Sequence, residues 1–286
     1  MKFTICSSLY YNISSASTVL CSISCSETPY QKISNESLTV NRPVTRSDLS
    51  VGLDGNRFTK LQTDEPGDLQ IQYSALVETS PRSVPANELS NRRDSTLDAV
   101  ALPYLFPSRY APADRMRAVA MDLFGNIQGD FNIAMAVEDW LFNHITYEAG
   151  SSDEQSWALD TLETRTGVCR DFAHLGIAFC RALTIPARYC TVYSYQLEPQ
   201  DFHAVFEVYI GGSWYVIDGT RKAPLNGMIR IATGRDASDA AVATLFGGVK
   251  GQGIAVDVQL ASNQNEAFNP VTREALMADG KAFFLS

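Results

Sequence analysis

The sequence predicts an α+β protein of two domains, in which an antiparallel β-sandwich precedes a domain of helices and strands. With 286 residues, the chain exceeds the usual size of one domain, and its 45% hydrophobic residues are enough for two cores. Short alternating runs with polar turns dominate the first part of the chain. Helical spacing of apolar residues begins only near Pro112.

The first domain is predicted from strand and turn signals. Apolar residues alternate with polar ones from Leu69 to Val77, and Asp54-Gly55-Asn56 is a turn signal between two short runs. Such runs are typical of a small antiparallel sandwich. Residues 79–97 are rich in proline and polar residues and lack periodicity, which predicts a linker. We therefore expect a β-sandwich domain with its linker at residues 1–95 and a second domain at residues 96–286.

The second domain is predicted to place three helices before three strands. The third helix begins near Val168, and Pro186 lies just past its end. Its expected buried stripe consists of Phe172, Leu175, Phe179 and Ala182. The other expected elements are the helices Pro112–Phe124 and Phe131–His144 and the strands Ala187–Tyr193, His203–Ile210 and Trp214–Ile217.

The composition argues against several classes of function. The net charge is −9, and basic pairs such as Arg92-Arg93 are isolated, so we expect no nucleic-acid partner. No run approaches the ~18 apolar residues of a membrane span, and Met1 to Tyr11 lacks the pattern of a secretory leader, so we expect a cytoplasmic location. The six cysteines form no C-x-x-C pair, and free thiols are expected rather than disulfides or a metal site. No cofactor is predicted.

Cys169 is the candidate nucleophile. It lies in the first turn of the third predicted helix, directly after Gly167-Val168. The positive end of the helix dipole at such a position favours the thiolate form of a cysteine. Free cysteines are more often buried and inert, and Cys180 and Cys190 fit that description. Cys169 is followed by an Arg-Asp pair, which indicates a more polar setting.

Only three histidines could act as its base. His174 follows Cys169 by five residues on the same helix, which leaves their side chains roughly 140° apart. We therefore interpret His174 as a packing residue. His144 closes the second predicted helix, where it can favour the negative end of the dipole. His203 opens a strand, and it is the candidate base.

A predicted hairpin connects His203 with Asp218. The strand from His203 to Ile210 runs into Gly211-Gly212, a pair that suits a two-residue turn. In that register Ile210 faces Ser213, Val205 faces Asp218, and His203 and Asp218 become diagonal neighbours on one face. A loop one residue longer would place them on opposite faces. Asp218 alone would be interpreted as a turn residue, but its place beside His203 predicts a functional role.

Together the three residues predict an activated nucleophile. The imidazole takes the proton of the thiol, and the carboxylate fixes the tautomer and orientation of the imidazole. An acyl group would then form a thioester with Cys169 and be released to water or to an amine. This arrangement occurs on unrelated folds, so it does not identify the substrate.

Four segments resemble motifs of the bacterial transglutaminase-like superfamily, in the same order along the chain. They are Thr166–His174 around the cysteine, Leu183–Tyr189 after it, His203–Asp218 with the histidine and aspartate, and Gly234–Asp239 downstream. Residues 1–95 are similar to the N-terminal β domain of these bacterial proteins, so the resemblance covers nearly the whole chain. It implies a papain-like α+β fold in the second domain.

Two positions depart from the pattern of the family. Val205 stands two residues after the histidine, where the family often has a tryptophan, and Gly219-Thr220 stands where Pro-Thr is frequent. Both departures leave the three catalytic candidates intact and bear on the substrate cleft.

An acyl-transfer site also needs hydrogen-bond donors for an oxyanion. The backbone N–H of Cys169 is one candidate, because it lies at a helix start. The side chains considered for the second donor are Tyr147, Gln155 and Trp157, which lie upstream in the chain.

Four functions are compatible with these residues. Hydrolysis of peptide or amide bonds is the first expectation, because bacterial members of the resembled family are regarded as candidate cysteine proteases. A protein-glutamine transglutaminase with an amine acceptor is the alternative. A catalytically silent binding module would require Cys169 to be buried and unreactive. A metal site formed by Cys169, His174 and His203 would lack the ligand spacing of known zinc motifs.

Overall fold

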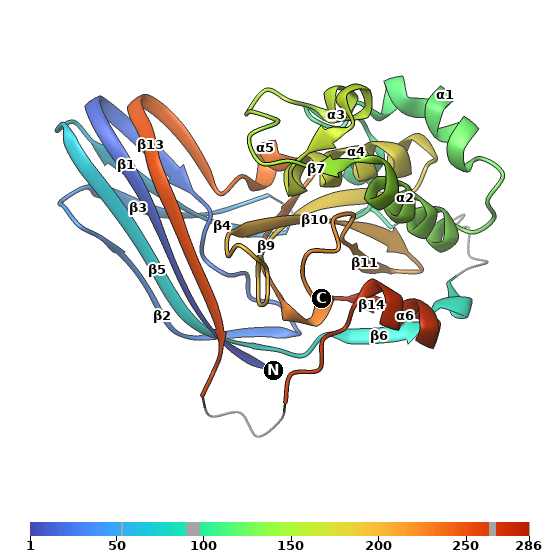
Figure 1. The fold of residues 1–286 in the computed structure, drawn as a ribbon. Coiled ribbons are helices and arrows are strands. Elements are labelled where there is room, and N and C mark those ends of the chain that lie inside the picture. The colour runs from blue at the N-terminus through green and yellow to red at the C-terminus, as the bar shows by residue number, and fades with distance from the viewer. Residues whose placement is uncertain (53, 90–97, 263–266, 286) are drawn as a thin grey trace.

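The computed structural model describes residues 1–52, 54–89, 98–262 and 267–285, and it confirms an α+β chain with an antiparallel β domain at its N-terminus. In Figure 1 the long strands of this domain fan out on one side of the molecule and the longer helices gather on the other. In the predicted linker, Arg92-Arg93 lies outside the described residues, whereas Arg82–Pro85 forms strand β6. β6 pairs with β14, Lys281–Phe284, so part of the predicted linker is a strand.

The first sheet is organised around the long strand β1, Lys2–Cys21. Every second side chain from Phe3 to Ile13 is buried, as in a sheet with one face on the core and the other in solvent. The stretch from Lys2 to Ile13 pairs with β5, and the stretch from Ser17 to Cys21 pairs with β4. The strand order is β2-β5-β1-β4-β3, formed by β2 (Gln31–Val40), β3 (Thr45–Val51), β4 (Asn56–Thr63) and β5 (Gly67–Thr79).

The chain returns to this first sheet near its C-terminus. Strand β13, Ala243–Leu260, pairs antiparallel with β1 along its length, from Phe3 opposite Leu260 to Cys21 opposite Ala243. The expected second domain, residues 96–286, thus includes a strand that completes the first sheet. Figure 1 shows β13 running beside β1, although the two strands are far apart in the sequence.

The remaining elements form a second unit, in which a four-stranded sheet of order β11-β10-β9-β12 packs against helices. Among the described residues no helix is long and apolar enough to cross a membrane. The helices are α1 (Ala113–Phe124), α2 (Asp130–His144), α3 (Ala158–Thr164), α4 (Cys169–Ala182), α5 (Ala237–Ala240) and α6 (Arg273–Asp279). The strands of the sheet are β9 (Ala187–Ser194), β10 (Phe202–Ile210), β11 (Ser213–Ile217) and β12 (Met228–Gly234). Short elements are β7 (Thr146–Tyr147), β8 (Thr166–Gly167), and the 3₁₀ turns Ala86–Glu88, Leu102–Leu105 and Leu225–Gly227.

Helix α4 is the centre of the second unit. The sequence predicts one buried stripe, but every residue of α4 from Asp171 to Ala182 is buried. α4 packs against α1, α2 and α3 and against strands β9 and β10. Contact with the sheet is close at Gly176, where an added Cβ would lie 2.5 Å from the ring of Phe206. Helices on several sides and a sheet therefore surround the helix that begins with Cys169.

Two amide side chains of the first unit bind strand β12 of the second. Gln31 donates to the carbonyl of Arg230 at 2.8 Å and accepts from its N–H at 2.8 Å. Asn56 makes the same reciprocal pair with Thr233, at 2.6 and 3.0 Å. Backbone N–H and C=O groups on the free edge of β12 are thus hydrogen bonded by side chains of the other unit. These side chains also block pairing of that edge with another chain.

Candidate active site

The turn that carries Cys169 is held by the buried carboxylate of Asp171. Its Oδ2 accepts the backbone N–H of Val168 at 2.8 Å, which satisfies one of the free donors at the start of α4. The hydroxyl of Ser152 donates to the same oxygen, and Arg170 contacts Oδ1 at 3.3 Å. Asp171 therefore links the start of α4 to the loop between β7 and α3.

Gly167 is required by this same arrangement. A Cβ at Gly167 would lie only 2.8 Å from the Cβ of Asp171 and 3.2 Å from its Oδ2. The missing side chain allows the Asp171 carboxylate to fold back over the residues before α4. The sequence motif Gly-Val-Cys-Arg-Asp thus combines a nucleophile with the residues that fix its turn.

His203 and Asp218 meet as the predicted hairpin requires. Gly211 and Gly212 have φ values of 60° and 86°, which a two-residue turn of this kind needs. The register places Ile210 opposite Ser213 and Phe206 opposite Ile217. The two-residue loop and the strand pairing are therefore confirmed. His203 Nε2 lies 2.9 Å from Asp218 Oδ2, and both side chains are almost fully buried.

The charge on this pair is set by competition between burial and neighbouring groups. Burial lowers the pKa of His203, but the carboxylate of Asp218 and the thiol of Cys169 outweigh it and raise the pKa to about 10. Burial also acts to raise the pKa of Asp218, but His203 and Thr220 hold it below its usual value. Asp218 Oδ1 accepts both the N–H of Thr220, at 2.9 Å, and its hydroxyl, at 2.7 Å. The arrangement favours an imidazolium beside a carboxylate.

Cys169 is the partly exposed member of the group, and it interacts electrostatically with both His203 and Tyr147. Its thiol lies near the imidazole of His203, because interaction with Cys169 is among the causes that raise the pKa of that imidazole. Because Nε2 of that ring is bound to Asp218, Nδ1 is the nitrogen left to take the proton of the thiol. The Tyr147 hydroxyl also lies near Cys169, because interaction with that residue is among the causes that shift the pKa of the tyrosine. The structure thus brings Cys169, His203, Asp218 and Tyr147 together.

A short parallel bridge explains how Tyr147 reaches the thiol. Tyr147 ends β7 and lies opposite Gly167 of β8, two residues before Cys169. Burial, together with the nearby Cys169 and Asp201, raises the pKa of Tyr147 to about 12, so its hydroxyl keeps its proton. Lys222 lies above the ring, with its ammonium nitrogen 4.3 Å from the centroid. A hydroxyl donor and a positive charge therefore lie close to the thiol.

The other two upstream residues lie differently. Gln155 is exposed in the loop before α3, where its backbone N–H donates to Asp153 at 2.9 Å. The indole N–H of Trp157 donates to Asp160 at 3.0 Å, and its ring packs beneath Arg115. This indole donor is engaged within α3 and is not available to an oxyanion in this arrangement.

His174 lies in the core of the second unit. It is fully buried, its ring stacks on Tyr110, and its Nε2 accepts the N–H of Ala237 at 3.1 Å. Nδ1 then carries the proton, and it has no hydrogen-bond partner among the described residues. Burial is the largest of the effects that lower the pKa of His174 to about 3. Such a side chain packs as a neutral ring.

This burial predicts acid sensitivity. Between pH 6.5 and pH 3 the unfolded chain binds a proton at His174 that the folded chain excludes. The free energy of unfolding should therefore decrease as the pH falls, by up to about 1.4 kcal/mol per pH unit. His174→Gln keeps an acceptor for Ala237 but no longer titrates. Its unfolding free energy, measured in urea at pH 7, 5 and 4, should decline less steeply than that of the wild type. Parallel declines would contradict the prediction.

The four buried cysteines are poor nucleophiles. All six are free thiols. Burial raises the pKa of Cys21, Cys25 and Cys190 to about 12, and it also raises the pKa of Cys180. Among the described residues no group of three or more His, Cys, Asp or Glu side chains is arranged to hold a metal ion.

Thiol labelling should therefore separate Cys169 from the rest. In a brief reaction with iodoacetamide at pH 6, we expect Cys169 to be alkylated first, because His203 stabilises its thiolate. Cys6 is exposed and provides an internal reference for an ordinary thiol. Peptide mapping by mass spectrometry gives the order directly. Faster labelling of Cys6, Cys180 or Cys190 than of Cys169 would contradict this assignment.

Comparison with known proteins places both parts of the chain in the same group. Residues 117–219 match the family model described as transglutaminase-like superfamily, and residues 1–98 match the bacterial transglutaminase N-terminal domain. The crystal structure of a putative cysteine protease from Cytophaga hutchinsonii is 40% identical in sequence, with a TM-score of 0.94, and the match covers 100% of this chain and 98% of that chain. The uncharacterized protein ML0607 of Mycobacterium leprae (strain TN) is 27% identical over 227 residues, which are 74% of this chain and 79% of that protein.

Proposed function

Because the chain belongs to the transglutaminase-like superfamily, we propose that it is a cysteine-dependent acyl-transfer enzyme that hydrolyses peptide or amide bonds. The observation that carries the proposal is the buried hydrogen bond of 2.9 Å between His203 Nε2 and Asp218, in an imidazole whose pKa is also raised by interaction with Cys169. The Cytophaga hutchinsonii protein, which is described as a putative cysteine protease, supports the choice of substrate class.

The reaction would proceed through a thioester. His203 accepts the proton of Cys169, the thiolate attacks the carbonyl carbon, and the imidazolium gives the proton to the leaving amine. Water then attacks the thioester while His203 acts again as base, and the acid is released with the thiol restored. Asp218 holds the imidazole throughout and stabilises its positive charge.

Two donors beside the thiol are suited to bind the oxyanion. The backbone N–H of Cys169 lies at the start of α4, and the interaction of Tyr147 with Cys169 puts the tyrosine hydroxyl beside it. We infer that the carbonyl oxygen of the substrate displaces this contact and accepts from both groups. The ammonium group of Lys222 over the Tyr147 ring adds a favourable charge for an oxyanion.

The position of Val205 bears on the choice between water and amine. Val205 is only 1% exposed and packs in a core cluster with Cys190 and Val216, so it does not form a wall of an open acceptor site. Tyr147, in contrast, is 40% exposed beside the thiol. An acceptor site that is open to solvent favours water, because an amine prevails only where the site binds it and excludes water.

The test follows both products from one reaction. Wild type and Cys169→Ala are given a peptide amide together with a fluorescent primary amine at millimolar concentration. We expect the free acid to form faster than the amine adduct with wild type, and neither product to form with Cys169→Ala. Adduct formation ahead of free acid across neutral pH would replace hydrolysis by amine transfer. Equal turnover by the two proteins would remove Cys169 from the mechanism.

A further inference from the structure

The turn that carries Asp218 rests on one face of helix α2. An added Cβ at Gly219 would lie 2.9 Å from the side chain of Leu141, so a larger residue here would require Leu141 to move. Arg221 closes the turn, with its N–H 3.3 Å from the carbonyl of Asp218. Glu138 lies three residues before Leu141 and thus on the same face of α2.

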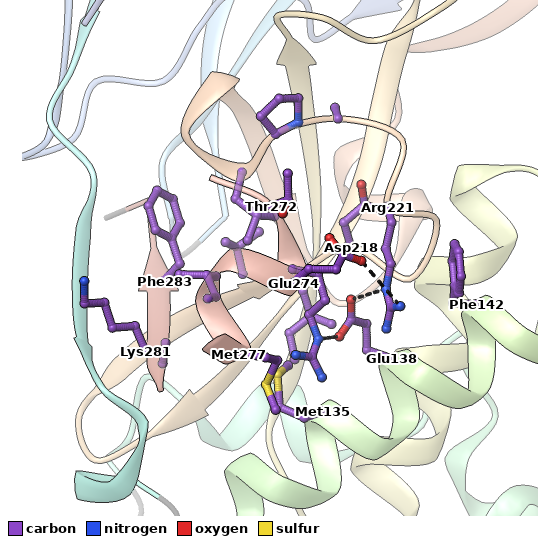
Figure 2. Close-up of a pocket in the computed structure, with 18 of the residues that line it drawn as sticks. Met135, Glu138, Phe142, Asp218, Arg221, Thr272, Glu274, Met277, Lys281 and Phe283 are labelled. Carbon is purple, nitrogen blue, oxygen red and sulfur yellow. Dashed lines mark hydrogen bonds and ion pairs between the residues drawn. The ribbon is translucent and has the colours of Figure 1, made fainter. Parts of the chain in front are cut away.

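Glu138 binds the far side of the turn through Arg221. Its Oε1 accepts the Nε–H of Arg221 at 3.0 Å, and the guanidinium also contacts Asp139 and stacks at 4.3 Å over the ring of Phe142. Arg221 has a φ of 53°, a backbone region that residues with a side chain seldom adopt. Figure 2 shows Glu138 facing Arg221 beside Asp218. The side-chain contacts therefore fix an unusual backbone conformation three residues after Asp218.

A second arginine holds Glu138 itself. Arg273, in the first turn of α6, donates to Oε2, so the carboxylate is shared between the loop after β11 and the C-terminal helix. The side chain of Glu138 is only 3% exposed. A cavity of about 270 Å³ borders this group and Asp218, and it is lined by apolar residues such as Met135, Phe142 and Phe283. Because a cavity lies on one side of the Asp218 turn, the turn is supported by the ion pairs and by the contact at Gly219.

We propose that Glu138 is a positioning residue, which holds the Asp218 turn through Arg221 and thereby sets the orientation of His203 toward Cys169. The role rests on the proposed function, since it matters only if His203 acts on the thiol. It touches no substrate atom. Replacing Glu138 by glutamine removes the buried carboxylate that both guanidinium groups share and leaves them only the half-exposed carboxylate of Asp139, so the turn is held less firmly against α2.

The chain supplies a matched control in Glu207. This residue is also fully buried between two arginines, with Arg188 at 2.7 Å and Arg230 as its second partner. It lies on β10 opposite Val216, and its two arginine partners come from β9 and β12 rather than from the Asp218 turn. Glu207→Gln should loosen a similar buried ion cluster without disturbing the turn.

The experiment measures alkylation of Cys169 by iodoacetamide from pH 5 to pH 9, with Cys6 as the reference thiol. Wild type should show a reactive plateau at low pH, where only a thiolate paired with imidazolium reacts. In Glu138→Gln the rate at pH 6 should fall roughly 10- to 100-fold, as expected for a displaced catalytic pair. Glu207→Gln should keep the plateau even where its melting temperature falls.

The outcomes separate the two proposals. The positioning role would be overturned if the plateau survives in Glu138→Gln. It would also be overturned if the plateau is lost equally in Glu207→Gln. Either outcome leaves the proposed function in place. A wild-type profile without the plateau, or a plateau unchanged in His203→Ala, would contradict the proposed function and the positioning role with it. If Glu138→Gln does not fold, Arg221→Gln tests the same contact from the loop, and the same loss of plateau is expected.

Discussion

Replacement of His203 by alanine should lower turnover of a peptide amide by roughly 10⁴- to 10⁶-fold. His203 is the titratable base that interacts with the Cys169 thiol, and the variant loses the group that takes the proton and returns it to the leaving amine. The thiol should then react as an ordinary cysteine. Steady-state kinetics give the loss in turnover, and the pH profile of alkylation gives the loss of the thiolate at low pH.

His174→Gln is the internal comparison for this variant. His174 is closer to Cys169 in sequence, but it is fully buried and bound to the N–H of Ala237. We expect His174→Gln to lose stability and to retain turnover within about tenfold of wild type when assayed below its melting temperature. Abolished turnover in a folded His174→Gln protein, with activity retained in His203→Ala, would reverse the assignment of the base.

The part of the site that the sequence predicts depends on local geometry. Whether His203 and Asp218 share a face follows from the length of one loop, and Gly211-Gly212 determines that length. The place of Cys169 at a helix start follows from Gly167 and from the apolar residues after it. Both inferences involve short stretches of chain, in which backbone geometry leaves few alternatives.

The parts that could not be predicted depend on contacts between distant segments. Strand β13 joins the first sheet because β1 lies beside it in space, and its glycine-rich sequence carries no strong strand signal. The full burial of α4 requires elements packed on several sides, whereas periodicity indicates only one stripe. Tyr147 is chosen among three upstream candidates by its bridge to Gly167.

Two positioning residues were also missed. The role of Asp171 could have been predicted from the sequence. An acidic residue at the third position of a helix can accept the free N–H of the residue just before that helix. The role of Glu138 could not, since Glu138 reaches Arg221 across 83 residues and Arg273 across 135. Charged residues on a predicted helix are usually interpreted as its solvent face, and only the fold shows that this one is buried.

Asp218→Asn should lower turnover by roughly 10³- to 10⁴-fold while the protein remains folded. The reason lies in the distinct tasks of the two carboxylate oxygens. Oδ2 accepts from His203 Nε2, and Oδ1 accepts from the N–H and the hydroxyl of Thr220. Asparagine offers only one oxygen, so one of these two partners must face an NH₂ group.

Either orientation of the amide harms the site. If the NH₂ group faces His203, the ring must accept at Nε2, and its proton moves to Nδ1, the nitrogen that should take the proton of the thiol. If the oxygen faces His203, the NH₂ group meets the N–H of Thr220, and two buried donors are left opposed. The pKa of His203 should in both cases fall from about 10, because burial is no longer opposed by a carboxylate.

The variant is therefore tested by three measurements on one preparation. Turnover should fall, the low-pH plateau of Cys169 alkylation should shift toward the pH of an ordinary thiol, and thermal unfolding should stay cooperative. Thr220→Val removes one hydroxyl donor but keeps the backbone N–H and the carboxylate, so it should lose far less activity and keep the plateau. Unchanged turnover and an unchanged pH profile in Asp218→Asn would reduce Asp218 to a residue that shapes the turn before Gly219.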